Sequence, residues 1–230
     1  MTEFMQNSAY AGVTISLTAY ALGAWLKRKF GFAFFNPLLI SIIVTIIALV
    51  GTGVDYDTYN KGAQYLTWLL TPATVCLAIP LYEEWELLKN NAKAVILGVL
   101  AGVITSLLTV YVCAKLMGLN HQNYVSLLPK SITTAIGMGV SEELGGYVTI
   151  TVAVIIITGV IGNILGEGIC KLFRIKEPIS KGLALGTAAH AIGTAKAMEL
   201  GDVEGAMSSL SIAVAGILTV VFASFFAGLI

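Results

Sequence analysis

Residues 190–201 read HAIGTAKAMELG, a stretch that combines a histidine, a lysine and a glutamate. Residues 135–145 read AIGMGVSEELG, so that AIG, five variable residues and ELG recur at an offset of 56 residues. The surrounding chain is 57% hydrophobic and only 11% charged. Two related polar stretches in so apolar a chain predict a structural unit that the chain uses twice.

Composition identifies the class of protein that contains this unit. The mean hydropathy is +0.88, and the apolar residues lie in runs near the ~20 residues that a helix needs to cross a bilayer. A soluble domain would instead need helices with regular charged faces. We therefore expect an all-α, polytopic membrane protein.

Several functional classes are disfavoured by the same inspection. Formal net charge is zero and the chain has no basic arm, so we expect no nucleic-acid partner. The three cysteines, Cys76, Cys113 and Cys170, are too widely spaced for a metal-ligand or disulfide pattern. Phosphate-binding loops, zinc motifs and nucleophile elbows are missing from the sequence, so we expect no metal or cofactor.

The apolar runs predict the number of membrane spans. Two further stretches, 125–145 and 182–205, are as long as the spans but rich in Gly, Ala, Ser and Thr. We assign residues 1–120 to a four-span scaffold and residues 121–230 to two hairpin-plus-helix units of one membrane domain. The six segments expected to span are 9–26, 37–54, 62–80, 94–116, 147–169 and 207–229.

Basic residues orient these spans. Lysines and arginines follow the first, third and fifth spans, and the positive-inside rule makes these loops cytoplasmic and both chain termini external. The fourth span then ends outside, where the fifth must begin, so 125–145 enters and leaves the membrane on one face. Segment 182–205 does the same from the inside. The residues that set this orientation are Lys27, Arg28, Lys29, Lys89, Lys93, Lys171, Arg174, Lys176 and Lys181.

Two re-entrant hairpins with legs of about 10 residues reach the middle of a ~30 Å hydrocarbon core. The predicted fold is thus about six spanning helices plus two broken or re-entrant hairpins in an inverted repeat, as in transporters with discontinuous helices around a midplane site. In the alternative, both segments cross fully and give eight spans. That alternative conflicts with the basic loop at 171–181, so we favour re-entrance.

The hairpins supply the candidate binding residues. Pro129, like Pro72 in the third span, is expected to break a helix and free backbone groups, which nearby hydroxyls either satisfy or aim at an anion. Small residues in the second stretch also have a purely structural use in close helix packing. The candidate substrate-binding residues are Ser131, Thr133, Thr134, Gly137, Thr187, His190, Gly193, Thr194 and Lys196.

The ionisable residues of the hairpins admit alternatives. His190 is a satisfied structural histidine, a proton-coupling group or a direct ligand. Lys196 and Glu199, three residues apart on a helix, could simply pair with each other. Glu143 and Glu199 occupy the same position of the repeat, and because Glu is only 10 of 230 residues, we assign them a coupling or structural charge.

Three runs also carry a family resemblance. They are TPATVCLAIPLY (71–82), LLPKSITTAIG (127–137) and KGLALGTAAHAIGTAKAMELGDVEGAMSSL (181–210). In this order they resemble the LrgB/CidB family of bacterial inner-membrane proteins, and the resemblance extends from about residue 30 to the end of the chain.

That resemblance implies no enzymatic activity and leaves two rival functions. One is antiholin-like or holin-like regulation of murein hydrolases and autolysis, together with a small LrgA/CidA-like membrane partner. The other is transport of small carboxylates, as implied by bacterial pairs linked to pyruvate and by a plant plastid relative that carries glycolate and glycerate.

The repeat decides which function we expect. A lysis regulator needs oligomerising helices but no inverted units with buried polar tips, whereas a transporter needs both units. We therefore expect a secondary carrier of small monocarboxylates of the pyruvate, glycolate or lactate type in the cytoplasmic (inner) membrane. Proton coupling stays open, and we expect an LrgA/CidA-like partner and homo-oligomers.

Overall fold

The computed structural model describes residues 10–31, 35–76 and 78–230, and all its regular elements within these ranges are helices. The chain divides into two compact units, Met1–Cys76 and Leu77–Ile230. The functional division predicted between residues 120 and 121 falls inside the second unit and stays a prediction. The predicted external N-terminus and the start of the first span, at residue 9, lie outside the described residues.

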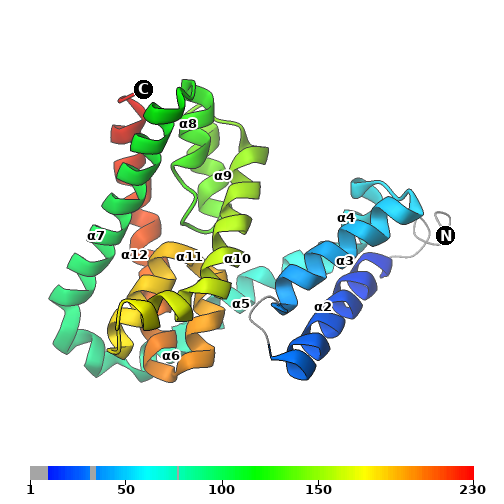
Figure 1. The fold of residues 1–230 in the computed structure, drawn as a ribbon, viewed down its shortest axis with the longest axis horizontal. Helices are drawn as coiled ribbons and strands as arrows, with labels where there is room; N and C mark the ends of the chain where they lie inside the picture. The colour runs from blue at the N-terminus through cyan, green and yellow to red at the C-terminus, as the bar shows by residue number, and fades with distance from the viewer. Residues whose placement is uncertain (1–9, 32–34, 77) are drawn as a thin grey trace. The chain divides into compact units, whose positions relative to one another are not determined.

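The first unit contains α2 (Ala11–Phe30), α3 (Pro37–Thr52), α4 (Tyr56–Trp68) and α5 (Leu70–Cys76), drawn in blue to cyan in Figure 1. Side chains cap two of these helices: Asn36 accepts hydrogen bonds from the first turn of α3, and Asp55 accepts one from the first turn of α4. A hydrogen bond of 2.7 Å between Ser16 Oγ and Tyr59 Oη joins α2 to α4.

The predicted span 62–80 differs from a single continuous helix. Helix α4 ends at Trp68, α5 begins at Leu70, and the next helix, α6, covers Ala78–Glu83. Pro72 explains the first break, because proline has no N–H to bond the carbonyl of Trp68 and its ring crowds that carbonyl.

The long apolar helices lie in the second unit. Among the described helices, three are long and apolar enough to cross a membrane: α7 (Trp85–Met117), α10 (Val148–Leu172) and α12 (Asp202–Ala227). They coincide with the predicted spans 94–116, 147–169 and 207–229. Helix α3 is apolar but shorter, with 16 residues. The prediction of an all-α polytopic membrane protein is confirmed.

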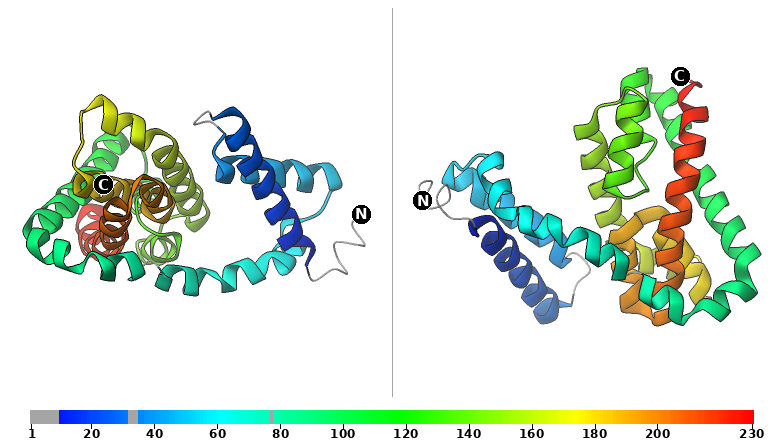
Figure 2. Two further views of the ribbon diagram at one scale, coloured as in Figure 1. Left: turned by 90° about the horizontal axis from the view of Figure 1, so that it is seen from below. Right: turned by 180° about the vertical axis from the view of Figure 1, so that it is seen from behind.

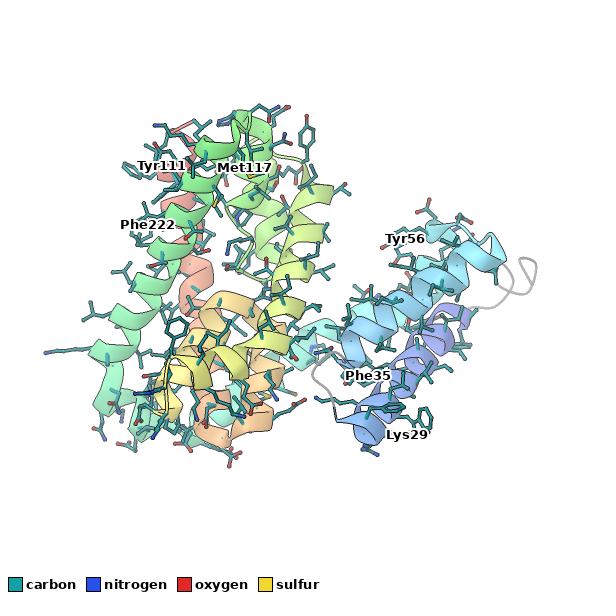
Figure 3. All side chains as sticks on the ribbon, viewed as in Figure 1. Lys29, Phe35, Tyr56, Tyr111, Met117 and Phe222 are labelled. Atoms are coloured by element: carbon teal, nitrogen blue, oxygen red, sulfur yellow. The ribbon has the colours of Figure 1, made fainter. Side chains whose placement is uncertain are left out.

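The core of the second unit lies between α7 and α12. Every third or fourth residue of α7 from Val95 to Ala114 is buried, which makes one apolar stripe along the helix. Figure 3 shows Tyr111 of α7 and Phe222 of α12 toward the same end of this unit, and both pack against the buried cluster. At the same end, the Tyr124 hydroxyl donates a hydrogen bond to the Phe226 carbonyl at 2.9 Å.

The first repeat unit folds as a helical hairpin. Helix α8 (His121–Leu127) and helix α9 (Thr134–Glu143) are joined by a turn that contains Pro129. Thr151 Oγ1 of α10 holds both legs, because it lies 2.9 Å from the Ser126 carbonyl of α8 and 2.7 Å from Ser141 Oγ of α9.

The second repeat unit is also a hairpin, made of two helical legs within α11. Helix α11 (Pro178–Leu200) has non-helical backbone at Ala189 and His190, where the chain turns back. A side chain at Gly193 would strike the Leu185 carbonyl, so the two legs of α11 are in direct contact across this turn.

The two hairpins open toward opposite ends of the unit, as Figures 1 and 2 show. The α8–α9 hairpin lies where α12 finishes, since Tyr124 contacts Phe226. The base of α11 lies where α12 begins, since Lys181 pairs with Glu204 at 3.5 Å. This opposition is the arrangement expected of an inverted repeat.

Candidate functional site

A groove of about 660 Å³ runs between α7 and the two hairpins of the second unit. The turn of the first hairpin closes one end of the groove, and the first leg of α11 forms the wall opposite α7. Its lining residues are mostly small or carry hydroxyl groups: Ala94, Gly98, Ala101, Gly102, Thr105, Ser106, Thr109, Lys130, Ser131, Ile179, Ser180, Leu183, Ala184, Thr187 and Ala188.

Lys130 is the cation of this groove. Its Nζ donates to Ser131 Oγ at 2.8 Å, and Ser131 Oγ lies 3.2 Å from Ser106 Oγ of α7. Lys130 is partly buried, and no acidic side chain of the described residues pairs with it. The groove therefore combines one uncompensated positive charge with two hydroxyl groups.

The turn around Pro129 places Lys130 beside the interior of α7. The N–H of Lys130 bonds to the Leu127 carbonyl at 3.2 Å and that of Ile132 to the Pro129 carbonyl at 3.3 Å, so the chain reverses within a few residues. Ser106, the contact of this turn, lies in the interior of the 33-residue α7. The turn thus ends well inside the length of the spanning helices.

Thr187 contributes a second unusual polar atom. Its side chain is 6% exposed, it lines the groove, and its Oγ1 has no hydrogen-bond partner within the described residues. Gly102 allows this approach, because a Cβ there would meet the Thr187 methyl group. A buried hydroxyl without a partner costs about 1–3 kcal/mol, which a ligand or water in the groove would offset.

His190 forms the tip of α11 but does not line the groove. Its Nε2–H donates to the Ile155 carbonyl of α10 at 3.0 Å, and its backbone has φ 41° and ψ −138°, which favour glycine. A Cβ on Gly159 would lie 2.8 Å from the His190 ring, so glycine is needed there for the contact. The ring fastens the strained turn to the middle of α10.

The predicted binding residues near His190 make contacts within the protein. Thr194 Oγ1 donates to the His190 carbonyl at 3.0 Å and lies 2.8 Å from Ser208 Oγ of α12. Gly193 contacts the first leg of α11, and Gly137 of α9 contacts the Ile155 side chain. Thr133 and Thr134, at the start of α9, are partly buried and lie outside the groove lining.

The charged residues of the repeat have unequal surroundings. Lys196 Nζ lies 3.1 Å from Glu167 of α10 and 3.2 Å from Glu199, so it joins the second leg of α11 to α10. Glu143 is exposed at the end of α9. The structure therefore brings Ser131 and Thr187 to one groove, whereas Lys196 and the two glutamates lie away from it.

The candidate residues predicted from the sequence did not include Lys130 and Ser106, which line the groove. For Lys130 a signal existed, because an ionisable residue directly after a helix-breaking proline in an apolar segment is a functional candidate. Ser106 gave no such signal, since a serine within a long apolar helix normally bonds its own backbone.

Comparison with known proteins places this geometry in a family. The profile of the LrgB-like family matches residues 16–229. The chain is 41% identical to the antiholin-like protein LrgB of Bacillus mycoides (strain KBAB4) over 92% of this chain and 93% of that protein. It is 40% identical over the same shares to proteins of that name from Bacillus cereus (strain B4264) and Bacillus anthracis (strain CDC 684 / NRRL 3495). No solved structure matches the chain.

Proposed function

The chain belongs to the LrgB-like family of membrane proteins, and from that premise we propose that it is a secondary carrier of small monocarboxylates. The observation that carries the proposal is Lys130, a cation in the interior of a membrane unit without an acidic partner among the described residues. Such a charge is costly in hydrocarbon, and an anionic ligand would neutralise it.

The chemistry of the groove supports a small anion with one charge. One ammonium group balances one carboxylate, while Ser131 and Ser106 offer hydroxyl donors beside it. A second carboxylate would find no second cation among the groove-lining residues. The largely apolar walls suit the short carbon chain of pyruvate, glycolate or lactate.

The opposed hairpins support alternating access as the mechanism. Lys130 and Ser131 come from the hairpin at one end of the unit, and Thr187 comes from the hairpin at the other end. Movement of one hairpin against α7 would open the groove toward that end. The ion pairs Lys181–Glu204 and Lys196–Glu167 would resist movement of α11 and favour one state.

The orientation proposed from the basic loops agrees with these neighbours. Lys89 and Lys93 lie within the first part of α7 and not in the loop that the sequence predicted, while residues 171–181 run from the end of α10 to the first turn of α11. Ala94 near the start of α7 and Ile179 near the start of α11 line the same groove, so these basic residues belong to one end of the unit. We assign this end to the cytoplasm and the C-terminus to the outside of the bacterial cytoplasmic membrane. An LrgA/CidA-like partner and a homo-oligomeric assembly remain part of the proposal.

A second candidate function is antiholin-like regulation of autolysis. The names of the relatives favour it, because each compared protein is called antiholin-like. In that case the groove would serve assembly rather than transport, and autolysis would change without carboxylate flux.

Counterflow in liposomes separates the two functions. The purified protein is reconstituted into liposomes with and without its LrgA/CidA-like partner. The liposomes are loaded with unlabelled pyruvate, and uptake of labelled pyruvate, glycolate and lactate is measured. The carrier account predicts saturable exchange that unlabelled competitor abolishes. Complete lack of exchange in both preparations, together with an autolysis phenotype of the deletion strain, would support the regulator and exclude the carrier.

A further inference from the structure

A second, smaller cavity lies at the end of α10, away from the carboxylate groove. It measures about 250 Å³ and is lined by Cys170, Lys171, Arg174, Ile175, Lys176 and Lys181. Lysine and arginine dominate this lining, and none of the lining residues is acidic. The cavity is therefore a concentration of positive charge at the end of a spanning helix.

Two of these four cations, Lys171 and Lys181, form ion pairs, and the other two form none with a described residue. Lys171 pairs with Glu167 at 2.8 Å, and Lys181 pairs with Glu204 at 3.5 Å. Arg174 and Lys176 form no ion pair with any described residue. An anion in the cavity would thus meet an excess of positive charge and several N–H donors.

The backbone at Arg174 gives an independent indication. Helix α10 ends with hydrogen bonds from Arg174 N–H to the Lys171 carbonyl and from Ile175 N–H to the Cys170 carbonyl, and Arg174 has φ 57°. This left-handed position strongly favours glycine. Helices α3, α7 and α9 end with the same pair of bonds, and there the position is filled by glycine: Gly53, Gly118 and Gly145.

General electrostatics explains part of this pattern. Cations are favoured at the C-terminus of a helix and on the cytoplasmic side of a membrane. Neither effect requires an arginine at the single position where the chain otherwise uses glycine, nor the convergence of four cations on one cavity. An arginine at a strained backbone position that also lines a basic cavity is a candidate for ligand binding.

We propose that this cavity binds a phosphate group, with a phospholipid headgroup as its source. Arginine and lysine are the side chains suited to phosphate, arginine through paired N–H donors. The end of a membrane-spanning helix lies at the depth of lipid phosphates, and basic pockets between helices on this side bind anionic headgroups. The lipids expected are phosphatidylglycerol and cardiolipin.

The test compares thermal unfolding of the full-length protein in nanodiscs of phosphatidylcholine alone or with phosphatidylglycerol or cardiolipin. Anionic lipid should raise the unfolding temperature of the native protein. In R174Q/K176Q the apparent lipid affinity should fall about tenfold. The control K89Q/K93Q removes two exposed cations from the same end of the unit and should keep the native lipid response.

The variant R174G gives results of opposite sign. Glycine relieves the left-handed backbone, so unfolding in phosphatidylcholine should shift upward by about 2–4 °C, while the response to anionic lipid weakens. An R174G protein with unchanged lipid response would overturn the proposal. Inorganic phosphate is tested in the same way. A rise in unfolding temperature with phosphate but none with anionic lipid would exclude the headgroup as the source of the phosphate group.

Discussion

The two hairpins share a plan but differ in what they hold at the tip and at the base. The α8–α9 tip carries Lys130, a cation without an acidic partner among the described residues, whereas the α11 tip carries His190, which is bonded to Ile155. At the base, hydroxyl and backbone hydrogen bonds hold α8–α9, while ion pairs through Lys181 and Lys196 hold α11.

This difference suggests a division of labour. Under the proposed function, the first hairpin would supply the charge that binds the anion, and it is held in place by hydrogen bonds between neutral groups. The second hairpin supplies the opposite wall and is fastened by ion pairs that can break one at a time. Repeated sequence has therefore produced similar backbones with distinct chemistry.

The largest effect is expected from removing the charge at the first tip. In K130Q, carboxylate exchange should fall at least tenfold, because the groove loses the cation that neutralises the anion. K130R should retain most of the exchange. Counterflow measures this effect, and K115Q, which removes an exposed cation of α7, is the matched control. Equal rates for K130Q and native protein would remove Lys130 from the mechanism.

The second tip should respond through stability. H190A loses the bond to Ile155, which costs about 1–3 kcal/mol, and retains the strained backbone of the native protein. H190G loses the same bond but relieves the strain, so it should unfold at a higher temperature than H190A. Thermal unfolding in detergent compares the two. The opposite order would show that the left-handed geometry at residue 190 is not maintained.

A smaller effect on exchange is expected from Thr187, in the groove wall formed by the first leg of α11. In T187V, the hydroxyl without a partner is replaced by a methyl group of similar size. If this hydroxyl contacts substrate, KM for exchange should rise severalfold while thermal stability is unchanged or slightly higher. T109V, on the α7 side of the groove, removes a hydroxyl already bonded to the Thr105 carbonyl and is the control. Loss of stability in T187V with unchanged KM would assign the hydroxyl a structural role.

The smallest effect concerns the base of α11. Lys196 is 17% exposed and Glu167 is 38% exposed, so solvent screens their ion pair. A double-mutant cycle of K196Q and E167Q should give a coupling free energy of about 0.5 kcal/mol that declines with added salt. A coupling that salt leaves unchanged would indicate a contact other than an ion pair.

Much of the fold followed from the sequence, because length and hydropathy alone determine which helices can span. The repeated AIG and ELG stretches predicted two broken segments, and α8–α9 and the kinked α11 occupy them. The location of the second break was less predictable. The chain turns at Ala189 and His190, where a tertiary bond to Ile155 holds a conformation that local propensity disfavours.

The site was less predictable than the fold, because a partner or its lack is a tertiary property. The amino-acid sequence does not show whether an acidic side chain pairs with Lys130; in the structure, none of the described residues does. Nor does it show that Ser106 lies beside Ser131. Likewise, the matched positions of Glu143 and Glu199 suggested a shared role; both are exposed, but Glu199 forms an ion pair with Lys196 and Glu143 forms none with a described residue.

Equilibrium binding of labelled pyruvate to the purified protein tests the central claim most directly, because it does not depend on transport, partner or membrane orientation. Native protein, K130R and K115Q are predicted to bind saturably, and K130Q is predicted to bind at least tenfold more weakly while its unfolding temperature is equal to or higher than the native one. Binding by K130Q with native affinity would contradict the account.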